Sequence, residues 1–157
     1  MTMKKISEKE ALLRLTALCS QAEHCSYEMT EKMKRWELTE QEQANVMEYL
    51  TRERYVDDER FARAFVTDKI RYNKWGRRKV EQALWMKHID SDIRRKVLDE
   101  VAPEEYDNVL RDLLKSKMKS IKAANSYERN MKLMRFALGR GFDASEVREL
   151  LGCDWEE

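Results

Sequence analysis

Apolar residues recur along the chain in three similar short stretches. In each stretch two apolar residues lie four positions apart, a third follows five positions later, and a Thr or Asp comes directly after it. The three stretches begin at residues 29, 80 and 133, so they are separated by 51 and then 53 positions. Their members are Met29, Met33, Leu38 and Thr39, then Val80, Leu84, Ile89 and Asp90, then Leu133, Ala137, Phe142 and Asp143.

Each stretch is typical of a helix that ends at a corner and is followed by another helix. Residues at i and i+4 share one face of a helix, and the third apolar residue anchors the turn. The Thr or Asp that follows is expected to accept a hydrogen bond from the free amides of the next helix. Residues 39–42 (TEQE) have the capping-box sequence, and Gly139 and Gly141 suit the helix exit in the third stretch.

Helical periodicity on both sides of each corner predicts two further helices, so the repeating unit has three helices. Asp57 or Asp58 is expected to cap the first helix of the second unit, and Pro103 suits the first position of a helix in the third. The first helices carry their apolar residues within 11–18, 61–70 and 110–121, and the third helices within 46–50, 93–97 and 147–151.

A three-helix unit of about 50 residues is marginally stable alone, and stacked neighbours bury its apolar faces. The chain is therefore predicted to be all-α, with three tandem three-helix repeats that form an elongated, curved array. The predicted repeats are residues 1–56, whose third helix is acidic, residues 57–102 and residues 103–157.

The composition agrees with a helical chain that has no large spherical core. Charged residues make up 39% of the 157 residues, and Gly and Pro occur only four times and once. Sheet proteins need many turns, so this scarcity of turn residues favours helices. The N-terminus does not resemble a signal peptide, and no apolar run has the length of a membrane span. We therefore expect a cytoplasmic, monomeric protein whose three cysteines are reduced.

The net charge of +1 conceals strong segregation of charge along the chain. Residues 37–59 contain eight acids and two bases, whereas residues 60–96 contain twelve bases and four acids. Residues 115–135 contain seven bases and one acid. Two basic segments thus follow an acidic one, which favours an anionic partner for the second and third repeats.

The densest basic cluster is the predicted turn at residues 71–79, where cations alternate with aromatic residues. Lys and Arg neutralise phosphates and aromatic rings stack on bases, so this turn is a candidate nucleic-acid site. The cluster also lies at a helix start, where free amides favour anions. The alternative is a solvated turn with Trp75 packed between repeats. The candidate residues are Arg71, Tyr72, Lys74, Trp75, Arg77, Arg78 and Lys79, with Lys87, Lys117, Lys122, Arg129, Lys132 and Arg135 beyond the turn.

Other chemistry finds little support in the sequence. The carboxylates of residues 57–59 are more simply helix caps than metal ligands. Cys19, His24 and Cys25 lack the paired spacing of a zinc site. The chain has no Gly-rich phosphate loop. We therefore predict a binding protein with no catalytic residues, no cofactor and no metal.

Residues 55–65 have the sequence YVDDERFARAF, which resembles the central signature of the RecX family, bacterial regulators of the RecA recombinase. Residues 24–29 (HCSYEM), 76–84 (GRRKVEQAL) and 136–142 (FALGRGF) resemble segments of its first, second and third repeats. The order is the same and covers nearly the whole chain, although Arg77 stands where many members have proline.

The resemblance implies three tandem three-helix repeats, which agrees with the repeat found in the apolar pattern. It also implies binding to the RecA–DNA filament, with largely non-specific DNA contact, and inhibition of RecA in DNA repair, recombination and the SOS response. Two other classes stay open at this point: a helix-turn-helix regulator that enters a major groove, and a helical-repeat scaffold unrelated to DNA.

Overall fold

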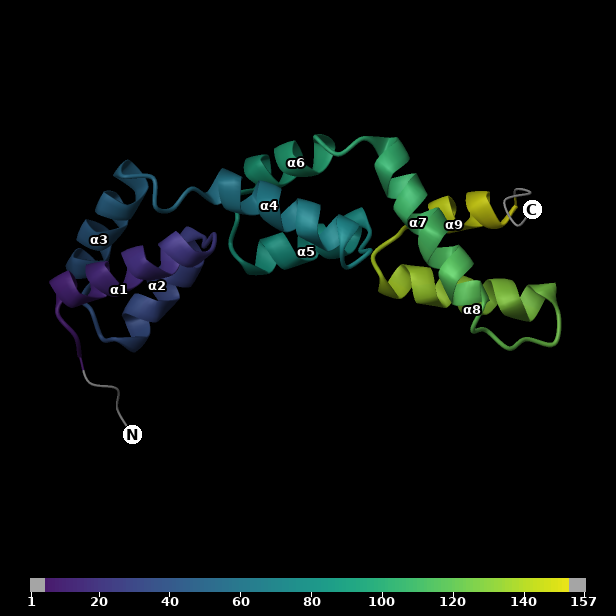
Figure 1. Cartoon of the computed structure of the whole chain (residues 1–157), viewed down its shortest axis with the longest axis horizontal. Coiled ribbons are helices and arrows are strands. Elements are labelled where there is room, and N and C mark those ends of the chain that lie inside the picture. The colour runs from purple at the N-terminus through teal and green to yellow at the C-terminus, as the bar shows by residue number, and fades with distance from the viewer. Residues whose placement is uncertain (1–4, 153–157) are drawn as a thin grey trace.

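The computed structural model describes residues 5–152, and within this range every regular element is a helix. The helices form three groups of three, arranged in a row from one terminus to the other (Figure 1). The elements are α1 (Glu8–Gln21), α2 (Ser26–Arg35), α3 (Glu40–Arg52), α4 (Asp58–Arg71), α5 (Arg77–Met86), α6 (Ser91–Asp99), α7 (Pro103–Met118), α8 (Ser126–Gly139) and α9 (Ala144–Leu151). The predicted all-α class and repeated three-helix organisation are confirmed.

The molecule is elongated rather than round. The three groups form a shallow arch, with the N-terminal and C-terminal groups at opposite ends (Figure 1). The solvent-accessible surface is 10201 Å², whereas a compact chain of 18.9 kDa exposes roughly 8300 Å². The high charge content is accommodated by this extra surface.

The corner between the second and third helices has the same geometry in all three repeats. The residue before the apolar anchor is in the left-handed region at Glu37 (φ 60°), His88 (φ 57°) and Gly141 (φ 97°). The anchor's backbone amide then donates to the carbonyl five residues earlier, over 3.1–3.2 Å. This is the Schellman arrangement, which satisfies carbonyls left free at a helix end. All nine apolar residues of the three predicted stretches are buried.

The helix caps follow the prediction in part. Thr39 accepts from the Glu42 amide and Glu42 accepts from the Thr39 amide, which confirms the capping box. Asp57 accepts from two amides of α4 and is the cap there. The expected caps at Asp90 and Asp143 are wrong, because neither side chain bonds its helix. The Asp143 carboxylate instead faces Arg78, 3.5 Å away.

Buried apolar residues form two separate clusters, which divide the chain unequally. One cluster belongs to the first repeat alone and includes Leu15, Met33 and Leu50. The other runs continuously through the second and third repeats and includes Cys25 from the first. The second and third repeats therefore share one core. The first repeat has a core of its own and is joined to them mainly by polar and aromatic contacts.

Polar and aromatic contacts join the first repeat to the second. Asp58 accepts from the backbone amide and the hydroxyl of Ser26, over 2.7 and 2.6 Å. The Tyr27 and His88 rings are stacked with centroids 4.0 Å apart. Cys25 fills a buried position here, and its thiol lies 3.9 Å from the Lys87 carbonyl. The start of α2 is thus held against the start of α4 and against the turn between α5 and α6.

Glu28 adds an ion pair to this junction. Partial burial alone would raise the pKa of its carboxylate. The hydrogen bond from the Cys25 amide and the contact with Lys87 at 3.2 Å outweigh burial, and they lower the pKa overall. Glu28 therefore stabilises the fold when it is ionised, and this contribution disappears as the pH falls through its lowered pKa.

We expect Glu28→Gln to destabilise the protein at pH 7, and we expect the difference to shrink as the pH is lowered. The amide lacks the negative charge that Lys87 favours, and the parental carboxylate loses the same charge as the pH falls through its lowered pKa. Urea midpoints measured from pH 7 to pH 3 check this convergence. Glu81→Gln is the control, since Glu81 is exposed and its carboxylate makes no ion pair within 4.0 Å among the described residues, although it lies near Arg77. A destabilisation that stays constant from pH 7 to pH 3 would contradict the assignment.

The backbones of the second and third repeats touch directly. The Gly76 amide donates to the Arg140 carbonyl over 2.6 Å, and the Arg78 amide donates to the Gly141 carbonyl over 3.1 Å. A Cβ atom on Gly76 would lie 2.5 Å from the Gly141 carbonyl carbon. A Cβ atom on Gly141 would lie 2.4 Å from the Lys79 Cβ atom. Only glycine allows α5 to approach this corner so closely.

Candidate nucleic-acid interface

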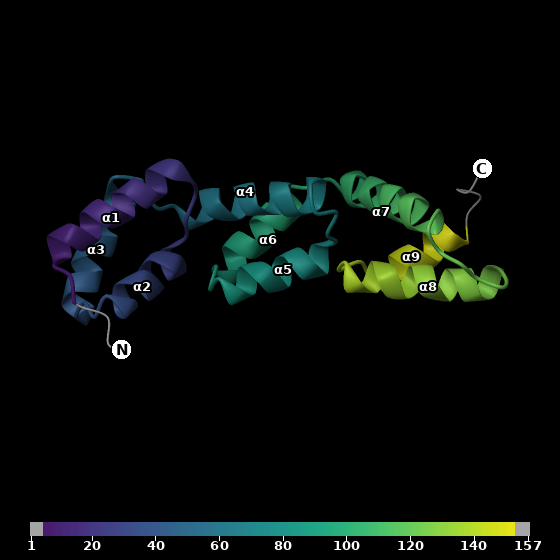
Figure 2. The ribbon, with the colours of Figure 1, turned by 60° about the horizontal axis from the view of Figure 1, so that its bottom comes forward.

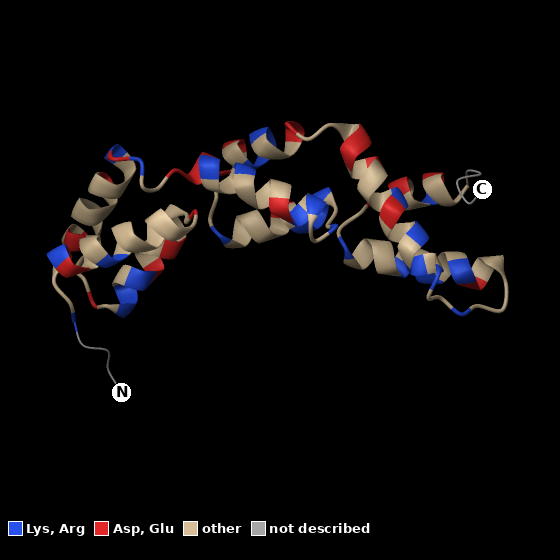
Figure 3. Ribbon diagram, viewed as in Figure 1, with Lys and Arg blue, Asp and Glu red and all other residues tan. Residues whose placement is uncertain are grey.

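The second helices of the three repeats form one row along the molecule. In the views of Figures 1 and 2, α2, α5 and α8 follow one another along the same side. Together they carry nine Lys or Arg residues against four Asp or Glu residues. The first helices of the three repeats (α1, α4 and α7) carry nine bases and nine acids. The third helices (α3, α6 and α9) carry five bases and seven acids. We call the row of second helices the second-helix face, and its three helices carry the largest excess of bases over acids among the three sets of helices (Figure 3).

Three arginines of the predicted basic turn reach acids on other elements. The Arg71 guanidinium lies 3.1 Å from Glu105, and the Arg77 guanidinium lies 2.6 Å from Asp99. The Arg78 guanidinium lies 3.5 Å from Asp143, and its side chain keeps 70% of its surface exposed. Arg77 is therefore engaged in a structural ion pair, whereas Arg71 and Arg78 keep 63% and 70% of their side-chain surface exposed and stay mostly open to a partner.

The Trp75 side chain is packed rather than fully presented to solvent. Its half-buried ring contacts the apolar core that the second and third repeats share, and the ammonium groups of Lys69 and Lys79 lie 5.0 and 4.5 Å from its centroid. This position agrees with a packed ring, as the alternative interpretation has it. Tyr72 is 80% exposed, and Lys74 occupies the left-handed turn just before Trp75. Of the two aromatic rings in the turn, only Tyr72 is presented for stacking.

The expectation of free anion-binding amides at the start of α5 is wrong for two of its amides. Those of Gly76 and Arg78 are occupied by carbonyls of the third repeat, as the glycine contact shows. The packing of the repeats thus uses the helix start that a phosphate would need. Any anion binding at this turn depends on the side chains.

Some of the predicted cations beyond the turn contact other side chains or carbonyls, and others have exposed side chains. Lys87 pairs with Glu28 at the first junction. Lys117 lies 4.7 Å from the centroid of the Phe136 ring. Lys132 donates to the Lys122 carbonyl over 2.6 Å and pairs with Glu128 over 3.3 Å. The Arg129 guanidinium donates to Asn130, whereas Lys122 and Arg135 have exposed side chains.

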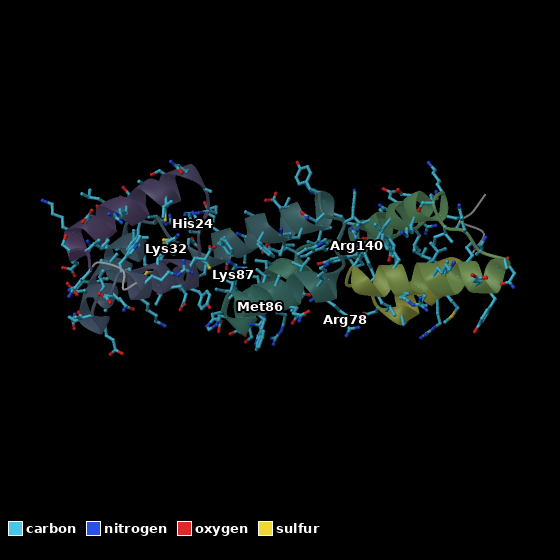
Figure 4. The ribbon with its side chains drawn as sticks, turned by 90° about the horizontal axis from the view of Figure 1, so that it is seen from below. His24, Lys32, Arg78, Met86, Lys87 and Arg140 are labelled. Carbon is cyan, nitrogen blue, oxygen red and sulfur yellow. The ribbon has the colours of Figure 1, made fainter. Side chains whose placement is uncertain are left out.

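The second-helix face includes Lys32 and Arg140, which the sequence patterns did not single out. Figure 4 shows them on one side of the molecule together with the predicted Lys87 and Arg78. Trp85 and Met86 on α5 were also missed, and they are 63% and 62% exposed. The spacing of Val80 and Leu84 marks the buried side of α5 and could have placed Trp85 on the outside.

The carboxylates of residues 57–59 have structural partners, as the simpler interpretation requires. Asp57 caps α4 and Asp58 holds Ser26. Hydrogen bonds from Lys96 and Arg63 lower the pKa of Glu59. Burial raises the pKa of the Cys25 thiol to about 12, so it is protonated at neutral pH. The residues with described positions contain no group of three side chains suited to a metal ion.

The helices are also too short or too polar for a bilayer. No helix between residues 5 and 152 has both the length and the hydropathy that crossing would require.

Comparison with protein families identifies the two later repeats separately. Residues 57–98 match the model described as RecX, second three-helix domain. Residues 104–151 match the model described as RecX, third three-helix domain. The first matched segment begins at Asp57, the N-cap of α4, and the second begins at Glu104, the second residue of α7.

Curated relatives extend the similarity over the first repeat. A protein of Chlorobium phaeobacteroides named Regulatory protein RecX is 29% identical over 151 residues, which cover 95% of this chain and 96% of the relative. One of Neisseria gonorrhoeae with the same name is 33% identical over 119 residues, which cover 76% of this chain and 74% of the relative. The chain spans 44% of the length of a third, from Oceanobacillus iheyensis, at 25% identity over 76% of this chain.

A solved structure has the same fold. A crystal structure of regulatory protein RecX superposes with a TM-score of 0.83 at 19% identity, over 92% of this chain and 72% of that one.

Proposed function

Because the chain belongs to the RecX family of regulatory proteins, we propose that it binds the RecA–DNA filament through its second-helix face and inhibits the recombinase. The observation that carries the proposal is the excess of Lys and Arg over Asp and Glu on α2, α5 and α8, which follow one another along one side of the molecule. A filament repeats its subunits and its phosphates along one axis. An elongated protein with one basic side is suited to contact several of them at once.

The charge arrangement favours this role over the other two classes. A helix-turn-helix regulator presents one basic recognition helix, usually in a symmetric dimer. Here each of the three repeats contributes basic residues on the same side. A scaffold unrelated to DNA has no need for a one-sided excess of cations. No catalytic step enters the proposal: inhibition follows from occupancy of the filament.

We expect the triple variant Lys32→Ala, Arg78→Ala and Lys132→Ala to bind RecA filaments about tenfold more weakly at fixed salt. It removes one cation from the second helix of each repeat. Each lost phosphate contact reduces the slope of log affinity against log salt by roughly 0.7–0.9. Fluorescence anisotropy with filaments on labelled oligo(dT), across several salt concentrations, measures both quantities. Inhibition of strand exchange should weaken in parallel.

The control triple variant removes the same charge from other helices. Lys9, Arg95 and Lys115 are exposed, lie on α1, α6 and α7, and have no acidic partner within residues 5–152. Their replacement with Ala should change filament affinity less than twofold and leave the salt slope intact. Equal losses in both triple variants would show that binding depends on overall charge and not on the second-helix face.

A further inference from the structure

The third repeat carries an apolar stripe on the outer side of α8. Leu133 and Ala137 face the core and are fully buried. On the other side Tyr127, Met131 and Leu138 are 75%, 46% and 42% exposed. Met134, which is half-buried, completes an i, i+4, i+7, i+11 series. Residues at this spacing lie along one face of a helix. Helix α8 therefore carries a second apolar face, which points away from the core.

The stripe forms one wall of a groove of about 670 Å³. The opposite wall is α9, which contributes Ala144, Leu151 and Arg148, and Gly152 follows at its end. The small residues leave space between the two helices. Two antiparallel neighbours with an apolar floor accept a third helix in the same way as the helix-binding grooves of other proteins.

The charge around the groove selects among helical partners. Arg148 is the one charged residue in the described lining, and it is exposed. Arg135 is exposed on α8, between Met131 and Leu138 in sequence. Neither arginine has an acidic partner within residues 5–152. A helix with acidic residues beside its apolar stripe would form ion pairs with both arginines.

We infer that this groove is a docking site for an acidic amphipathic helix of a partner protein. Apolar residues at i, i+4 and i+7 of that helix would pack on Met131, Met134 and Leu138, and its flanking carboxylates would meet Arg135 and Arg148. A nucleic acid fits less well, because the two cations at the groove are Arg135 and Arg148 and the lining between them is mostly apolar. The inference stands on the groove alone and does not depend on filament binding.

The probe is a labelled synthetic helix of the length of α8 with Leu at i, i+4, i+7 and i+11 and Glu at the flanking positions. We expect the full chain to bind it at least tenfold more tightly than a matched peptide with Lys in place of Glu. Leu138→Glu should weaken binding at least tenfold, because it places a charge in the apolar wall. Arg148→Glu should remove most of the preference for the acidic peptide.

Leu13→Glu is the matched control, since Leu13 is 62% exposed on α1, far from the groove. It should bind the acidic peptide as the parent does, and circular dichroism should show that all three variants remain helical. Equal affinity for the two peptides, or an unchanged Leu138→Glu variant, overturns the inference. So does self-association of the parent that Leu138→Glu abolishes, which would assign the groove to a second copy. The inference is also overturned if the Leu138→Glu variant loses oligonucleotide binding but keeps its affinity for the acidic peptide.

Discussion

Gly141→Ala is expected to destabilise the second and third repeats by about 3 kcal/mol, the largest effect of any single change considered for this protein. Gly141 has a φ of 97°, a conformation that strains any residue with a Cβ atom. The new methyl group would also lie 2.4 Å from the Lys79 Cβ atom and 2.6 Å from its backbone amide nitrogen. Both effects act at the point where α5 meets the third repeat.

Urea unfolding monitored by Trp75 fluorescence measures this effect, because the Trp75 ring packs against the core that the second and third repeats share. The control is Gly139→Ala, two residues away at the same corner. No atom lies within 4 Å of a Cβ added at Gly139, which belongs to α8. That variant should be neutral or slightly more stable, since Ala favours a helix more than Gly. Similar destabilisation by both substitutions would refute the close backbone approach.

Asp58→Ala is expected to destabilise the first repeat by about 2 kcal/mol and to separate its unfolding from that of the rest. The carboxylate holds both the amide and the hydroxyl of Ser26, at the start of α2. The first repeat has its own apolar core, so few buried contacts replace this link. Losing the acceptor also leaves the Ser26 amide without its partner.

Two single-tryptophan variants distinguish the repeats in this experiment. Trp36 packs on the first core and Trp75 on the shared core. In urea, Asp58→Ala should shift the Trp36 transition to lower concentration more than the Trp75 transition. Asp92→Ala is the control, because Asp92 lies in the first turn of α6 and contacts no other repeat among the described residues. Equal shifts at both tryptophans would mean that the repeats unfold as a single unit.

The architecture was predictable because its signal is local. Each repeat places two apolar residues and an anchor at fixed spacing, and the buried face follows directly from that spacing. The left-handed corner was visible only at Gly141. Glu37 and His88 adopt the same conformation in the other repeats, although neither residue type predicts a left-handed backbone as glycine does.

The candidate site was less predictable, because its charges are balanced by residues distant in sequence. Arg71, Arg77 and Arg78 meet acids that are 34, 22 and 65 positions away. A count of neighbouring charges treats all three as equally available. The second-helix face likewise depends on how the repeats are stacked, so Lys32 and Arg140 emerged only from the fold.

The most direct test of the proposed filament interface is photocrosslinking from single positions on opposite sides of the molecule. A photoreactive residue at Lys32, Gln82 or Lys132 lies on the second-helix face, whereas one at Glu48 or Arg95 lies on a third helix. On RecA–DNA filaments, the first three positions should crosslink to RecA or DNA and the other two should not. Crosslinks mainly from Glu48 and Arg95 would contradict the account.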